Sequence, residues 1–86
     1  MEASITSLRL LMVEDTLEDA ELILHELRRA GYNPAYERVE TATGLEAALR
    51  RSEWDIVISD YVLPGFSGLE ALAIVRKAAP YPPFIL

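Results

Sequence analysis

The stretch DIVISDYVLPGFSG, residues 55–68, decides the fold of this chain. It opens with a short apolar run, Ile56–Ser59, that ends at an acid, Asp60. An apolar run too short for a helix predicts a strand buried on both faces, as in parallel sheets. The remainder predicts a loop, because three of its residues fix or free the backbone: Pro64, Gly65 and Gly68.

Three further strands are predicted on either side of this stretch. Residues Leu8–Val13 are almost wholly apolar and are followed at once by Glu14 and Asp15, which repeats the pattern of a buried strand ending at an acid. A more polar strand is predicted over Ala35–Val39, where charged residues suit an exposed sheet edge. A last, buried strand is predicted over Phe84–Leu86, after a group of prolines.

Three helices are predicted between these strands. The first ends at Gly31, and its apolar face consists of Leu17, Ala20, Ile23, Leu24, Leu27 and Ala30. The second begins with a capping-box pattern formed by Thr43 and Glu46. The third begins with the same pattern, Ser67 and Glu70, and its predicted buried residues are Leu69, Leu72, Ala73 and either Ile74 or Val75.

The alternation of strands and helices predicts an α/β fold, with a parallel sheet and helices on both faces. At 86 residues the chain is expected to form one domain. Its net charge of −6 offers no positive field for direct binding of nucleic acid. The absence of cysteine excludes thiolate metal sites, and no apolar stretch is long enough to span a membrane. We therefore expect a cytoplasmic protein.

Three acids are predicted to meet at one edge of the sheet. Glu14, Asp15 and Asp60 follow the first and third strands, which are neighbours if the second strand lies outside the first. Carboxylates about 4 Å apart repel by about 4 kcal/mol at an effective dielectric near 20, so the cluster needs a cation or a proton. Because no His or Cys accompanies these oxygens, the donor set points to Mg²⁺. The backbone carbonyl of Val62 is a further candidate ligand.

Asp60 is the acid best placed to act as a nucleophile. A carboxylate that lies beside Mg²⁺ on an exposed loop can attack phosphorus, because the metal offsets the repulsion between two anions. Three motifs follow one another along the chain: LLMVED at residues 10–15, DIVISDYVLPGFSG at residues 55–68, and the helix start LEAL at residues 69–72. In this order they resemble a response-regulator receiver domain of two-component signalling.

The resemblance implies a flavodoxin-like fold with strand order 2-1-3-4. Residues 1–86 would form the N-terminal portion of a receiver domain, ending after its fourth strand, without the fourth helix, fifth strand and fifth helix of the family. The phosphodonor would be a sensor histidine kinase or a phosphotransfer protein. The domain would be no enzyme in the usual sense, beyond catalysing its own phosphorylation.

The resemblance also implies a role for each residue that matches the family motifs. Asp60 would be the phosphoacceptor and would also contact the metal, Mg²⁺ or Mn²⁺. Asp15 would be a direct metal ligand, Glu14 a ligand directly or through water, and Val62 the carbonyl ligand. The loop that follows the phosphoacceptor would be shaped by Pro64 and Gly68.

Two alternatives stay open. The first is a pseudo-receiver that binds proteins or dimerises without being phosphorylated, because the Ser or Thr and the Lys that contact the phosphoryl group in the family lie past Leu86. The exposed edge of Phe84–Leu86 would then pair with a second copy. The other alternative is a phosphatase that forms a phospho-aspartate at Asp60, although Val62 occupies the position of the second acid that such enzymes usually need.

Overall fold

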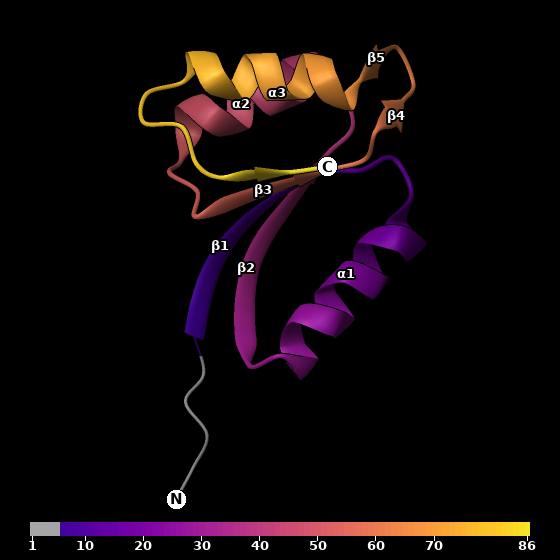
Figure 1. Ribbon diagram of the computed structural model, residues 1–86, viewed down its shortest axis with the longest axis vertical. Helices are drawn as coiled ribbons and strands as arrows, with labels where there is room; N and C mark the ends of the chain where they lie inside the picture. The colour runs from indigo at the N-terminus through magenta and orange to yellow at the C-terminus, as the bar shows by residue number, and fades with distance from the viewer. Residues whose placement is uncertain (1–5) are drawn as a thin grey trace, which may run out of the picture.

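The computed structural model describes residues 6–86 and contains one parallel sheet of four strands (Figure 1). The strand order is β2-β1-β3-β6. Because β4 and β5 form a separate small hairpin, β6 is the fourth strand of this sheet, and the predicted order 2-1-3-4 and the α/β class are confirmed. The strands are β1 (Thr6–Val13), β2 (Tyr32–Val39), β3 (Ile56–Ser59) and β6 (Phe84–Ile85). This order places β1 and β3 side by side, so the segments that follow them leave the sheet at the same edge.

Helices cover both faces of the sheet. Helix α1 (Leu17–Arg29) lies on one face, whereas α2 (Ala42–Arg51) and α3 (Gly68–Lys77) lie together on the other (Figure 1). Alternate residues of β1 serve the two sides: Leu10 and Met12 pack with α1, and Leu11 and Val13 belong to the larger cluster under α2 and α3. Within residues 6–86, no helix is both long enough and apolar enough to cross a bilayer.

Both outer strands of the sheet differ from the prediction. Strand β2 begins at Tyr32 and includes Pro34, because an edge strand tolerates a proline that a central strand would not. It pairs with all of β1, from Thr6 opposite Tyr32 to Val13 opposite Val39. The prediction that Phe84–Leu86 is a buried strand is wrong in part, because β6 holds only two residues and Ile85 is half exposed. Its place at the edge of the sheet agrees with the predicted strand order.

The second helix begins earlier than predicted. Its N-cap is Thr41 and not Thr43, because Thr41 has the extended backbone of a cap and its Oγ1 accepts a hydrogen bond from the Gly44 amide at 3.0 Å. The first helix ends near Gly31 as predicted. Two residues expected on its apolar face, Leu17 and Ala30, are exposed instead, because they lie at its ends and only the middle of the helix packs on the sheet.

The third helix begins as predicted but presents a different face to the sheet. The capping box is complete: the Glu70 amide donates to Ser67 Oγ, and the Ser67 amide donates to Glu70 Oε1. Its buried residues are Gly68, Ala71 and Val75, whereas Leu69 and Ala73, which were predicted to be buried, are exposed. The close contact of Gly68 with the end of β3 sets this rotation of the helix.

Candidate functional site

Glu14, Asp15 and Asp60 converge at the carboxyl edge of the sheet. One carboxylate oxygen from each residue lies within 4.8 Å of the others. The register explains this convergence, because Val13 lies opposite Ser59, so the residue after each strand comes next to its counterpart. The Asp60 amide donates a hydrogen bond to the Val13 carbonyl oxygen at 2.9 Å and continues the ladder one step past the strands.

Glu14 is the most restrained of the three acids and is only 5% exposed. Its amide donates to the Val39 carbonyl oxygen at 3.0 Å, and its Oε1 accepts from the Thr16 amide at 3.1 Å. Burial raises the pKa of the Glu14 carboxyl above its ordinary 4.5, and the hydrogen bond from Thr16 opposes this. The charge of Asp60 contributes further to the rise, followed by that of Asp19.

The Asp60 side chain lies with the other acids and does not turn into the apolar interior. Its Oδ1 accepts a hydrogen bond from the Tyr61 amide at 3.1 Å, which restricts rotation of the carboxylate. The Asp60 carbonyl oxygen accepts from Ser59 Oγ at 2.9 Å. The carboxylate is therefore held at the rim by its own main chain and remains partly accessible to solvent.

The loop after Asp60 folds back as a small hairpin. Strands β4 (Val62–Leu63) and β5 (Phe66–Ser67) pair antiparallel, and Gly65 at the turn has a φ of +82°. Pro64 precedes this glycine and is exposed. The side chain of Val62 is 73% exposed, and the use of its carbonyl as a ligand stays a prediction.

Gly68 links this hairpin to α3 and lies against the main chain of Asp60. Its amide donates to the Tyr61 carbonyl oxygen at 2.7 Å. A Cβ placed on Gly68 would stand 2.6 Å from the Asp60 carbonyl oxygen, and it would also collide with the side chain of Leu86. The close approach of two main chains therefore requires glycine here.

Arg38 is a residue of the site that the sequence did not identify. Its Nη1 donates a hydrogen bond to the Glu14 carbonyl oxygen at 3.0 Å and lies 3.6 Å from Glu40 Oε2. In the sequence, Arg38 looks like a charged residue on an edge strand. The strand register is the signal that could have found it, because Arg38 lies opposite Met12, two residues before Glu14.

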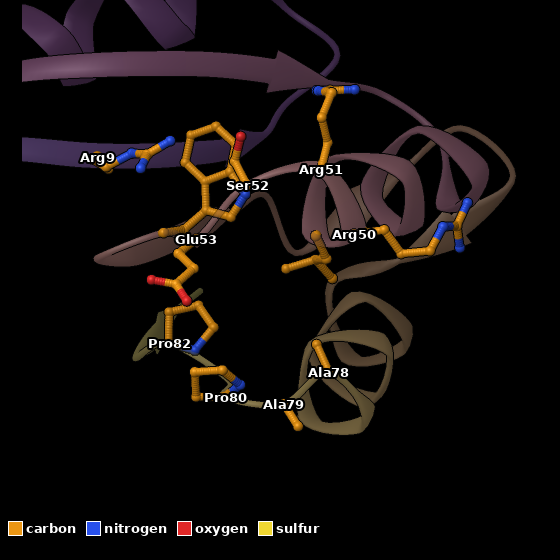
Figure 2. A pocket seen from close by; sticks show the side chains of 11 residues that line it. Arg9, Arg50, Arg51, Ser52, Glu53, Ala78, Ala79, Pro80 and Pro82 are labelled. Atoms are coloured by element: carbon orange, nitrogen blue, oxygen red, sulfur yellow. The ribbon is translucent and has the colours of Figure 1, made fainter.

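One cavity of the described residues has none of the three acids in its lining. It has a volume of about 480 Å³ and is lined by residues at the ends of α2 and α3 together with Arg9 and Trp54. Figure 2 shows that its side chains do not converge: Arg50 and Arg51 extend away from the opening. Trp54 is fixed by a hydrogen bond from Nε1 to the Ala48 carbonyl oxygen, which indicates a packing role.

The donor set at the rim suits a hard divalent cation. Three carboxylates offer oxygen atoms to one point, and within residues 6–86 this is the group of acids close enough to share an ion. Mg²⁺ and Mn²⁺ prefer such ligands, whereas Zn²⁺ favours nitrogen and sulfur. The residues present therefore fit the metal that the sequence motifs imply.

Comparisons with known proteins identify relatives for most of the chain, although no family model matches it. An uncharacterised transcriptional regulatory protein of Bacillus subtilis, YrkP, is 36% identical over 75 residues, which cover 86% of this chain and 31% of that protein. The chain thus spans about a third of the length of the curated transcriptional regulators it matches.

Two solved structures share the fold. The chemotaxis response regulator CheY4 of Vibrio cholerae has a TM-score of 0.73 and 26% identity, and the match covers 92% of this chain and 66% of that one. The non-phosphorylated receiver domain of HemR from Leptospira biflexa has a TM-score of 0.68 and 28% identity, covering 88% of this chain and 60% of that one. Both matches extend over nearly all of the described residues.

Proposed function

This chain is related to response-regulator receiver domains and has their fold, and we propose that it accepts a phosphoryl group on Asp60. The observation that carries the proposal is the convergence of Asp60 with Glu14 and Asp15 at the rim. A lone acid after a strand is common, but three acids that share one point and lie on the motifs of this family favour a phosphoacceptor site.

The proposed metal is Mg²⁺, with Mn²⁺ as an alternative. Carboxylate oxygens of Glu14, Asp15 and Asp60 would hold it, together with the carbonyl oxygen of Val62. When bound, the ion offsets the repulsion between the Asp60 carboxylate and an incoming phosphoryl group. Pro64 and Gly68 shape the loop, and Gly68 does so by allowing α3 to start against the Asp60 main chain.

The proposed reaction is transfer of a phosphoryl group from a phosphohistidine. A carboxylate oxygen of Asp60 attacks phosphorus, the new O–P bond forms, and the N–P bond of the donor breaks with its electron pair returning to the imidazole nitrogen. The Tyr61 amide fixes one oxygen of the nucleophile through its 3.1 Å hydrogen bond. The chain's own residues thus orient the attacking group for this transfer.

The proposed partner is a sensor histidine kinase or a phosphotransfer protein. Such a donor must bring its imidazole to the rim, where Asp60 is partly exposed beside the β4–β5 hairpin. We place this exchange in the cytoplasm and propose no contact with nucleic acid or membrane by this segment. Its sequence is acidic overall, with a formal net charge of −6.

Phosphorylation by acetyl phosphate with Mg²⁺ tests the assignment. The chain has four aspartates, and the matched pair of variants is Asp60→Asn and Asp19→Asn, both near the rim. We expect phosphoryl incorporation, measured by intact mass, in the native chain and in D19N, and none in D60N. Incorporation that persists in D60N contradicts the assignment.

A second candidate function is self-association through β6, as in a pseudo-receiver. Strand β6 is the last strand of the sheet, and within residues 6–86 nothing pairs with its outer edge. Ile85 and Leu86 are each 50% exposed there. An unpaired edge with apolar side chains favours pairing with a second copy. Sedimentation velocity should show dimers in the native chain that Ile85→Lys abolishes; a native monomer at every concentration rules this out.

A further inference from the structure

Positive charge is almost excluded from the acid rim. The chain has eight Lys and Arg residues, and the structure describes all of them. Six are in the last turns of the helices, where cations complement the helix dipole: Arg28, Arg29, Arg50, Arg51, Arg76 and Lys77. Arg9 lies in β1, where its main chain is hydrogen-bonded to Asp55 and its guanidinium lies over the Trp54 ring. Arg38 is the one cation at the carboxyl edge.

The strand register places Arg38 on the same face of the sheet as Glu14. Arg38 lies opposite Met12 on the neighbouring parallel strand, and Glu14 follows Met12 by two residues. The guanidinium extends along this face to the Glu14 carbonyl oxygen, 3.0 Å from Nη1. The Arg38 side chain is 25% exposed, so the hydrogen bond is partly shielded from water.

Both main-chain groups of Glu14 are consequently hydrogen-bonded to residues of β2. Its amide donates to the Val39 carbonyl oxygen at 3.0 Å, and its carbonyl oxygen accepts from Arg38. That carbonyl belongs to the peptide group that joins Glu14 to Asp15. A restraint on this peptide therefore fixes the direction in which both carboxylates leave the chain.

We propose that Arg38 is a positioning residue for the metal ligands. Its hydrogen bond holds the Glu14–Asp15 peptide so that both carboxylates face Asp60 before an ion arrives. The inference rests on the proposed metal site and adds a residue outside the acid cluster.

The Arg38→Lys variant tests the effect of the hydrogen bond separately from the effect of the charge. Lysine keeps the positive charge, but its shorter side chain ends before the position of Nη1 and does not reach the Glu14 carbonyl. Loss of one charge-assisted hydrogen bond should weaken Mg²⁺ binding by about three- to tenfold, measured by calorimetry on the full chain. The matched control is Arg76→Lys, the same exchange at an exposed residue of α3.

A second readout needs no metal. The amide nitrogen of Asp15 belongs to the peptide whose carbonyl accepts from Arg38, so its NMR chemical shift reports this hydrogen bond directly. In the metal-free protein we expect the Asp15 signal to move in R38K and to stay in place in R76K and in Glu40→Gln. The E40Q variant removes the ionic neighbour of Arg38 and leaves the hydrogen bond to Glu14 intact.

Two results overturn the proposal while leaving the metal site intact. One is a native chain and an R38K variant that bind Mg²⁺ equally well. The other is an Asp15 signal that does not move in R38K. A native chain that binds no Mg²⁺ has a different meaning, because it overturns the metal site and this inference together.

Discussion

Gly68 and Asp60 are in main-chain contact, and this contact joins the start of α3 to the end of β3. A Cβ on Gly68 would stand 2.6 Å from the Asp60 carbonyl oxygen, closer than any side-chain carbon can lie. The same oxygen accepts from Ser59 Oγ. The helix and the candidate nucleophile therefore share one rigid junction, and a change on one side must move the other.

Gly68→Ala should destabilise the chain and disturb the acid site. The added methyl group meets main chain, which cannot rotate away, and overpacking of this kind costs about 1–3 kcal/mol. Denaturant unfolding measures the loss. Gly44→Ala is the control, because its Cβ would meet the Thr41 side chain at 3.1 Å and alanine favours a helix. Equal stability of the two variants would contradict the tight junction.

The metal-free chain should lose stability as the pH rises through the raised pKa of Glu14. Above the ordinary value of 4.5, the folded state holds a proton on Glu14 that the unfolded state has released. The contribution of Glu14 to stability is therefore greatest below pH 4.5 and is lost as the pH rises through the raised pKa. Glu14→Gln should remove this contribution, so the difference in free energy of unfolding between E14Q and native protein should grow with pH. A difference that is constant with pH rejects this interpretation.

Mg²⁺ should raise the melting temperature of the native chain. Binding to the folded state alone adds about 2.7 kcal/mol at a hundredfold excess over the dissociation constant. Asp15→Asn should abolish most of this gain because it removes one of the three converging carboxylates. Thermal melts with and without millimolar Mg²⁺ provide the measurement, with Glu53→Gln, an exposed acid away from the rim, as the control. No shift in the native chain contradicts the site.

Thr41→Ala and Thr43→Ala should differ in stability. Thr41 Oγ1 accepts a hydrogen bond from the Gly44 amide and caps α2, so its removal should cost about 1 kcal/mol. Thr43 lies within the helix and is exposed, and alanine there should be neutral or slightly stabilising. Urea unfolding of both variants gives the comparison. If Thr43→Ala were the less stable of the two variants, Thr43 would be the N-cap, as the sequence alone predicts.

The strand order was expected from the resemblance to receiver domains, and the meeting of the acids could be predicted from local patterns once that order is given. Each buried strand is a short apolar run, and Glu14, Asp15 and Asp60 directly follow two of these runs. Once β1 and β3 are neighbours, the ends of parallel strands must coincide. The roles of these acids in binding metal and phosphoryl groups stay predictions.

The predictions from sequence that were wrong or missing concern features that depend on tertiary packing. Two threonines two residues apart both fit a helix cap, and the end of β2 at Val39 decides in favour of Thr41. Leu69 is apolar yet exposed, because the contact of Gly68 with β3 fixes the rotation of α3. Arg38 could not be identified from its own strand, since its role depends on the register between β1 and β2.

Six of the eight Lys and Arg residues lie in the last turns of the helices, so we expect a negative potential at the edge of the sheet where Asp60 lies. A partner that carries basic groups around its donor imidazole would rotate in this field and meet the acidic end first. Productive encounters should then slow as ionic strength rises, because added salt shortens the range of the field. Such a partner would then be oriented during diffusion, before the two surfaces touch.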